Sequence, residues 1–259
     1  MNGNPLKPYF DEGRPAFGGW CTTGAPFPAE LIALHGYDWM GIDAQHGLFG
    51  YDSLVVTLMT LARTGCGIVV RMPSRDAAAA GKVLDAGAHG VIFPMIETAE
   101  HAREAVDACR IYPDGKRSFG PMRASQSFGR DPIAVSDGAL CIVMVETALG
   151  VSNIEEITAV PGVDAIYIGP ADLAITMGLA PAMLPVPGPH ADGIERILQA
   201  GKANGVVVGI PTSTAADALA YAERGFGLMA VGSDTWWLNE CAGREAGVLR
   251  DSGHLGRRS

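Results

Sequence analysis

The chain has 259 residues, of which 48% are hydrophobic and only 18% carry a charged side chain. This composition supports a large buried core and excludes disordered and coiled-coil proteins. Acidic residues outnumber basic ones by 28 to 19, and the formal net charge of −9 argues against a nucleic-acid partner, which requires clustered positive charge. A small anionic ligand is compatible with this balance, because one or two local cations suffice to bind it.

The five cysteines are scattered and include no CxxC pair, which is typical of reduced, mostly buried thiols in a cytosolic protein. The amino-terminal stretch MNGNPLKPYFDEGR is polar and does not resemble a signal peptide. No apolar run approaches the roughly 20 residues needed to cross a bilayer. We therefore expect a cytoplasmic protein with no membrane partner.

Eight short apolar runs, rich in β-branched residues, recur along the chain. Runs such as IVVRM and CIVMVE are apolar on both faces, which is typical of parallel strands covered on both sides. We predict strands at Phe17–Thr22, Trp39–Gln45, Gly67–Met72, Gly90–Met95, Leu140–Glu146, Ala165–Gly169, Val206–Pro211 and Leu228–Gly232.

Segments rich in Ala, Leu and Glu separate these runs, and several end in glycine, as helices often do. We predict helices at Tyr51–Arg63, Asp76–Ala86, Ala99–Arg110, Ile194–Asn204 and Thr214–Arg224. Eight such units predict an α/β protein with a single closed (β/α)8 TIM barrel over residues 1–259. The alternative is an open doubly wound sheet, but no GxGxxG follows the first strand.

Two stretches of the chain are less regular than the rest. They are Tyr112–Asp137 and Gly178–His190, the second of which contains four prolines. Because long loops in a compact domain are more often functional than idle, both are of interest for the site.

Polar residues end several of the predicted strands, where the chemistry of such barrels lies. Glu146 ends the fifth strand, and Asp172 follows the sixth. Two neighbouring carboxylates with no Cys or His beside them suit a divalent cation that keeps water ligands. The structural alternative is that each carboxylate caps the helix that follows it.

Arg71 ends the third strand, where an unpaired cation is costly, so it implies an anionic partner. That partner is either a substrate carboxylate or a structural pair with Asp43 or Glu146. His46 ends the second strand within an acidic turn and is the histidine best placed for proton transfer. From the residues around it, Asp85 is expected only to lie on the surface or to cap a helix.

Several strings together resemble the HpcH/HpaI aldolase family of class II, metal-dependent pyruvate aldolases, over roughly residues 15 to 240. They occur in family order and are DWMGIDAQHG, VVRMP, LDAGAHGVIFPMIETAEHA, KRSFGPMRA, VMVETALGVSNIEEI and DAIYIGPADLAITMG. The combination of GPADL, VET and the DxxH turn is specific, whereas any one of them alone is weak.

The resemblance implies a barrel of the phosphoenolpyruvate/pyruvate-binding type, assembled as a hexamer in which the last helix, about 235–250, is exchanged with a neighbouring subunit. It implies a divalent metal ion (Mg, Mn, Co, Ni or Zn) held by Glu146 and Asp172. It further implies pyruvate binding by Arg71, Gly169, Pro170 and Ala171, and catalysis by Arg71, His46 and an Asp85 that pairs with this histidine across a subunit boundary.

The implied reaction is the reversible cleavage of a 4-hydroxy-2-oxo acid to pyruvate or hydroxypyruvate and an aldehyde, through a metal-bound enolate. Gln45 replaces the family's usual glutamate, Met144 replaces a glutamine that touches pyruvate, and RSFG (residues 117–120) replaces the common RGxG. No lysine ends a strand, which argues against a Schiff base.

Two other functions remain as alternatives. One is a citrate-lyase-like lyase acting on a CoA thioester, against which the acidic balance argues, because CoA phosphates need basic partners. The other is a catalytically silent binding barrel, against which the presence of Arg71 and of both metal carboxylates argues.

Overall fold

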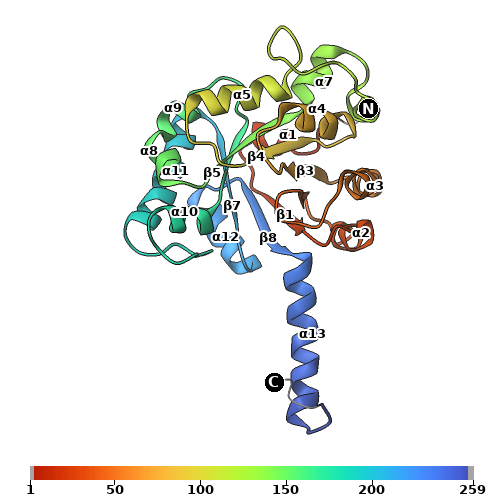
Figure 1. Cartoon of the computed structure of the whole chain (residues 1–259), viewed down its shortest axis with the longest axis vertical. Coiled ribbons are helices and arrows are strands. Elements are labelled where there is room, and N and C mark those ends of the chain that lie inside the picture. The colour runs from red at the N-terminus through yellow and green to blue at the C-terminus, as the bar shows by residue number, and fades with distance from the viewer. Residues whose placement is uncertain (1–2, 256–259) are drawn as a thin grey trace.

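The computed structural model describes residues 3–255, which form a closed barrel of parallel strands surrounded by helices (Figure 1). The strands are β1 (Ala16–Cys21), β2 (Trp39–Asp43), β3 (Gly67–Arg71), β4 (Gly90–Phe93), β5 (Leu140–Val145), β6 (Ala165–Ile168), β7 (Val207–Pro211) and β8 (Leu228–Ser233). Each strand pairs in parallel with the next, and β8 closes the ring on β1. The predicted (β/α)8 barrel is therefore confirmed, and the open-sheet alternative is wrong.

Helices connect the strands and form the outer layer. They are α1 (Lys7–Asp11), α2 (Pro26–Ala33), α3 (Tyr51–Leu61), α4 (Ala77–Asp85), α5 (Ala99–Cys109), α6 (Ala124–Phe128), α7 (Pro132–Gly138), α8 (Ala148–Ser152), α9 (Ile154–Thr158), α10 (Pro170–Thr176), α11 (Pro189–Asn204), α12 (Ala215–Arg224) and α13 (Asp234–Asp251). The irregular stretch at 112–137 contains α6 and α7, and α11 begins earlier than predicted, at Pro189 rather than Ile194.

Three aromatic rings fill the interior of the barrel, and each packs against a glycine of a neighbouring strand. Trp39 packs over Gly18, Trp20 over Gly41 and Tyr167 over Gly209. A Cβ added to any of these glycines would lie 2.2–2.7 Å from the nearest ring atom, which is closer than van der Waals contact allows. The rings also pack on one another, with Trp20 stacked on Tyr167 and edge-on to Trp39. Such packing holds the rings in one arrangement.

The amino-terminal mouth of the barrel is closed. Leu6, just before α1, is fully buried in the same cluster as Trp39 and lies against Gly67 at the start of β3. Since this end is plugged by the chain itself, the barrel can open to a ligand only at the carboxyl ends of the strands, as in other barrels of this kind.

The last helix, α13, projects away from the barrel instead of packing against it (Figure 1). Asp234 is its only buried residue. Trp236, Leu238 and Val248 are all substantially exposed along its length. Within residues 3–255 no helix combines the length and apolar character needed to span a membrane.

Candidate active site

A cavity of about 420 Å³ lies at the carboxyl ends of the strands. The side chains predicted to meet there come from β2, β3, β5 and the start of α10. The cavity is lined by Trp20, Thr22, His46, Arg71, Met144, Glu146, Tyr167, Ile168, Gly169, Pro170, Ala171, Asp172, Met183, Pro211, Thr212, Ser213, Ala230, Gly232, Ser233 and Trp236. All the predicted site residues except Asp85 therefore converge on one rim.

Glu146 follows β5 directly and is only 2% exposed. Its Oε1 accepts a hydrogen bond of 2.8 Å from the backbone N–H of Met95. Its Oε2 lies against Gly169, where an added Cβ would come within 2.4 Å of this oxygen. A glycine after β6 is therefore what leaves room for the carboxylate.

Burial raises the pKa of Glu146 to about 6, and the negative charge of Asp172 acts in the same direction. The Met95 N–H and the more distant Arg71 oppose this shift. The pKa stays raised in spite of them, because the buried carboxylate has lost the water that would solvate its charge. Such a pair of carboxylates favours a bound cation.

Neither carboxylate caps the helix that follows it with a side-chain hydrogen bond, although Asp172 lies in the first turn of α10, where the helix dipole favours a negative charge. The N-cap of α8 is Thr147, whose hydroxyl accepts from the Gly150 N–H, and not Glu146. The N-cap of α10 is Gly169, and Asp172 lies in the first turn without a side-chain capping bond. Among residues 3–255, Oε2 of Glu146 and the carboxylate of Asp172 have no hydrogen-bond partner and are left for a ligand.

Arg71 is held by the carboxylate of Asp43, the residue opposite it on β2. Its Nε and Nη2 donate to the two oxygens of Asp43, at 3.0 and 2.5 Å, while its guanidinium lies 5.3 Å from the ring centre of Trp20. The pair is largely buried, with 13% and 2% of the two side chains exposed. Among residues 3–255, Nη1 of Arg71 has no hydrogen-bond partner. The arginine is therefore paired with Asp43 and still has an N–H donor free to bind a ligand.

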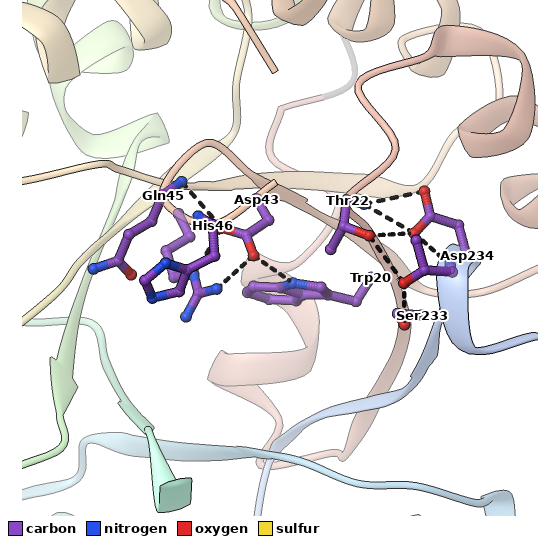
Figure 2. Close-up of polar contacts among 9 residues, drawn as sticks. Trp20, Thr22, Asp43, Gln45, His46, Ser233 and Asp234 are labelled. Carbon is purple, nitrogen blue, oxygen red and sulfur yellow. Dashed lines mark hydrogen bonds and ion pairs between the residues drawn. The ribbon is translucent and has the colours of Figure 1, made fainter. Parts of the chain in front are cut away.

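Asp43 also organises the turn that carries His46 (Figure 2). Its Oδ1 accepts the backbone N–H groups of Gln45 and His46, at 3.0 and 3.1 Å, and the Trp20 indole N–H donates to its Oδ2 at 3.4 Å. Although burial acts to raise it, the pKa of Asp43 is held below its ordinary value by Arg71 and, to a smaller extent, by the N–H groups of His46 and Gln45. One ionised carboxylate therefore fixes both the arginine and the histidine turn.

A second buried carboxylate lies on the other side of Trp20 from Asp43 (Figure 2). Asp234, the first residue of α13, accepts the N–H and hydroxyl groups of Thr22 and Thr23, at 2.7–3.0 Å. This contact ties the end of β1 to the start of the projecting helix. Thr22, Ser233 and Trp236 from the two segments all face the cavity.

Asp85 does not face this cavity. It is the last residue of α4, and its carboxylate accepts from Nη2 of Arg117 at 2.7 Å. The 116–123 loop packs beside it, with the Arg123 N–H donating to the Asp85 carbonyl oxygen. Within one chain, the structure therefore does not bring Asp85 and His46 together, and the loop does not act as a lid over its own cavity.

Sequence reasoning missed several residues of the cavity. Thr22, Thr212 and Ser213 follow β1 and β7, so the same search for polar residues at strand ends could have found them. Trp20 and Tyr167 lie within apolar strands, and Met183 and Trp236 come from the 178–188 loop and α13. Nothing in the local sequence marks these four as cavity residues.

Comparisons with known proteins show the family to which the chain belongs. The chain is 37% identical over 238 residues to a 4-hydroxy-2-oxovalerate aldolase of Rhodococcus jostii, covering 90% of each chain. It is 38% identical over 251 residues to a hydroxypyruvate/pyruvate aldolase of Delftia acidovorans, covering 95% of this chain and 93% of the relative.

Among solved structures, an HpcH/HpaI aldolase/citrate lyase family protein from Burkholderia cenocepacia has a TM-score of 0.86 and 34% identity, covering 95% of this chain and 99% of the other. Residues 17–240 match the family model described as HpcH/HpaI aldolase/citrate lyase. The protein belongs to the HpcH/HpaI aldolase/citrate lyase family.

Proposed function

We propose that the protein is a class II aldolase that reversibly cleaves a 4-hydroxy-2-oxo acid to pyruvate, or hydroxypyruvate, and an aldehyde. The observation that carries this proposal is the convergence of Glu146, Asp172, Arg71 and His46 on one cavity. Two relatives, 37% and 38% identical to this chain, are a 4-hydroxy-2-oxovalerate aldolase and a hydroxypyruvate/pyruvate aldolase. Their names support a 2-oxo acid as substrate.

The residues present fit a divalent metal ion. Within residues 3–255 no group of three or more His, Cys, Asp or Glu side chains forms a metal cage. Glu146 and Asp172 supply two oxygen ligands, and a pair of carboxylates suits Mg²⁺ or Mn²⁺, which keep water or substrate in their remaining positions. When bound, such an ion acts as a Lewis acid on the keto oxygen of the substrate.

Arg71 would bind the anionic end of the 2-oxo acid. Asp43 occupies Nε and Nη2, which fixes the plane of the guanidinium and leaves Nη1 directed elsewhere. A preorganised cation contributes most where negative charge develops during the reaction. Gly169, Pro170 and Ala171 line the facing wall, and we assign them to the same 2-oxo acid.

His46 would accept the proton of the C4 hydroxyl during cleavage and return it to the aldehyde oxygen during synthesis. The backbone N–H bond to Asp43 holds its turn at the rim. Asp85 is remote from the cavity of its own chain, so we assign it to the site of a neighbouring subunit, where it would orient that subunit's His46.

The projecting helix supports assembly with further copies of the chain. On either side of β8 and β1, α12 and α2 expose Leu219, Phe27 and Leu31, each about half exposed or more. A barrel helix would normally cover this position, but α13 points away from it (Figure 1). We propose that α13 of a second copy covers this apolar surface and that the assembly is a hexamer.

All five cysteines are free, and four of them are buried. Free thiols fit a reducing compartment, and we propose that the protein is cytoplasmic.

Pyruvate release from 4-hydroxy-2-oxo acids tests the activity. The protein is stripped with EDTA, assayed, and assayed again with Mn²⁺ or Mg²⁺. We expect turnover only with added metal, and its loss in Glu146→Gln. Equal turnover without metal would overturn the roles of Glu146 and Asp172, and turnover of a CoA thioester alone would favour a citrate-lyase-like reaction.

A further inference from the structure

The connection between α10 and α11 forms part of the cavity wall. Residues 178–188 link the two helices, and Met183 from this loop lines the cavity. α10 itself carries Asp172 in its first turn. The geometry of this connection therefore bears on where one of the two cavity carboxylates lies.

His190 joins these parts. It is the second residue of α11 and is completely buried. The backbone N–H of Val186, in the loop, donates to its Nδ1 at 3.0 Å. Its Nε2 lies 3.0 Å from the carbonyl oxygen of Pro170, the first residue of α10.

These two contacts fix the proton on the ring. A backbone N–H can only donate, so Nδ1 of His190 is the unprotonated acceptor. The hydrogen of the neutral ring is then on Nε2, which donates to the Pro170 carbonyl oxygen. Both nitrogens are thus used, one for the loop and one for the turn that carries Asp172.

Apart from the bonds of its own helix, such as that of the Leu173 N–H to the Gly169 carbonyl oxygen, the turn at 169–172 has few hydrogen bonds to the rest of the barrel. Pro170 has no N–H to donate. On the barrel side, the Gly169 N–H donates to the Val145 carbonyl oxygen at 3.2 Å, next to Glu146. His190 bonds to the same turn from α11, so both bonds contribute to where the Asp172 carboxylate lies relative to Glu146.

We propose that His190 is a positioning residue for the cavity: through its Nε2–H bond to the Pro170 carbonyl, it holds Asp172 at the spacing from Glu146 at which the two carboxylates bind a divalent cation. This inference rests on the proposed metal site. Outer partners of metal ligands typically change affinity by about 10–100-fold when they are removed, and His190 acts at one remove from the ligand, so we expect the lower end of this range.

Two substitutions separate the two ring bonds. The side-chain amide of Gln reaches the place of Nε2, so His190→Gln retains the donor to Pro170 and loses the acceptor for Val186. The side-chain amide of Asn reaches only the place of Nδ1, so His190→Asn retains the loop bond and loses the bond to Pro170. Each variant loses one of the two hydrogen bonds that the buried ring makes to the backbone, so the pair separates the two bonds within one buried position.

His89 provides a control elsewhere in the barrel. It is also buried, its Nδ1 accepts from the Ile68 N–H at 3.0 Å, and it lies just before β4, at the closed amino-terminal end. His89→Asn keeps this acceptor and removes part of the ring, so it reports the general effect of asparagine at a buried histidine far from the cavity.

The test is Mn²⁺ binding, followed by the electron paramagnetic resonance signal of free Mn²⁺, together with amide hydrogen exchange of residues 170–177 in the metal-free protein. We expect His190→Asn to raise the Mn²⁺ dissociation constant about 10-fold and to speed exchange in this segment. We expect His190→Gln to stay within about twofold of the parent in both, and His89→Asn to lower only the midpoint of thermal unfolding.

Equal effects of His190→Asn and His190→Gln, or unchanged exchange of residues 170–177 in His190→Asn, would overturn the inference. Neither readout requires aldol turnover. If the protein binds Mn²⁺ with the expected difference between variants but releases no pyruvate, the proposed reaction fails and the role of His190 stands.

Discussion

Gly169→Ala is the substitution that most sharply probes how the cavity is built. The Gly169 backbone has φ −101° and ψ 85°, so alanine meets no left-handed strain there. Its Cβ would lie 2.4 Å from Oε2 and 2.7 Å from Cβ of Glu146, whereas ordinary contact begins near 3.4 Å. The Glu146 carboxylate must therefore move by about 1 Å, and a misplacement of this size costs on the order of 100-fold in rate.

The assay compares kcat for pyruvate release, Mn²⁺ affinity and thermal unfolding in Gly169→Ala and in a matched variant. Gly201→Ala creates the same kind of overlap, 2.3 Å from Cγ2 of Val208, between α11 and β7. Both overpacked variants should lose roughly 1–3 kcal/mol of stability. Only Gly169→Ala should lose activity and metal affinity, and equal activity losses in the two variants would refute the reasoning.

Three further predictions follow from the same contacts. In metal-free protein the pKa of Glu146 is raised to about 6 from 4.5, so the native state holds the proton more tightly than the unfolded state does. Stability therefore falls as pH rises from 4.5 to 6, by about 2 kcal/mol in total. Thermal unfolding of Glu146→Gln should lack this loss, and a pH profile identical to that of the parent would contradict the burial of the charge. Asp43→Asn should destabilise the protein by about 3–5 kcal/mol, because it leaves the largely buried Arg71 unpaired, and denaturant unfolding showing a loss below 1 kcal/mol would argue against the pair. The inactive variants His46→Ala and Asp85→Ala should recover roughly a quarter of the parent activity when they are mixed, unfolded and refolded together. Random assembly gives about a quarter of the sites an intact His46 from one subunit and an intact Asp85 from its neighbour. No recovery would show that Asp85 does not belong to the site of a neighbouring subunit.

The barrel itself was accessible from the sequence because its signals are local. β-branched runs that are apolar on both faces predicted all eight strands, and strand ends then predicted that Glu146, Asp172, Arg71 and His46 would converge. The pairing of Arg71 with Asp43 was among the predicted alternatives, since the two residues end adjacent strands.

The remaining features depend on contacts between distant segments. α11 begins at Pro189, where proline suits the first helical position, and His190 in its first turn bonds back to the loop and to Pro170, twenty positions away in the chain. No local pattern distinguishes that histidine from a surface one. Likewise, the fit of Tyr167 over Gly209 needs the β6–β7 register, which sequence spacing does not give.

The central claim is that the cavity binds a 2-oxo acid and a divalent cation so that the methyl group of pyruvate becomes acidic. Proton NMR of pyruvate in D₂O measures this directly and needs no knowledge of the aldehyde. We predict that the protein with Mg²⁺ exchanges the methyl protons for deuterium, and that EDTA-stripped protein and Glu146→Gln do not exceed the buffer rate. Exchange that persists in Glu146→Gln, or its absence with Mg²⁺, Mn²⁺, Co²⁺, Ni²⁺ and Zn²⁺ alike, would contradict the account.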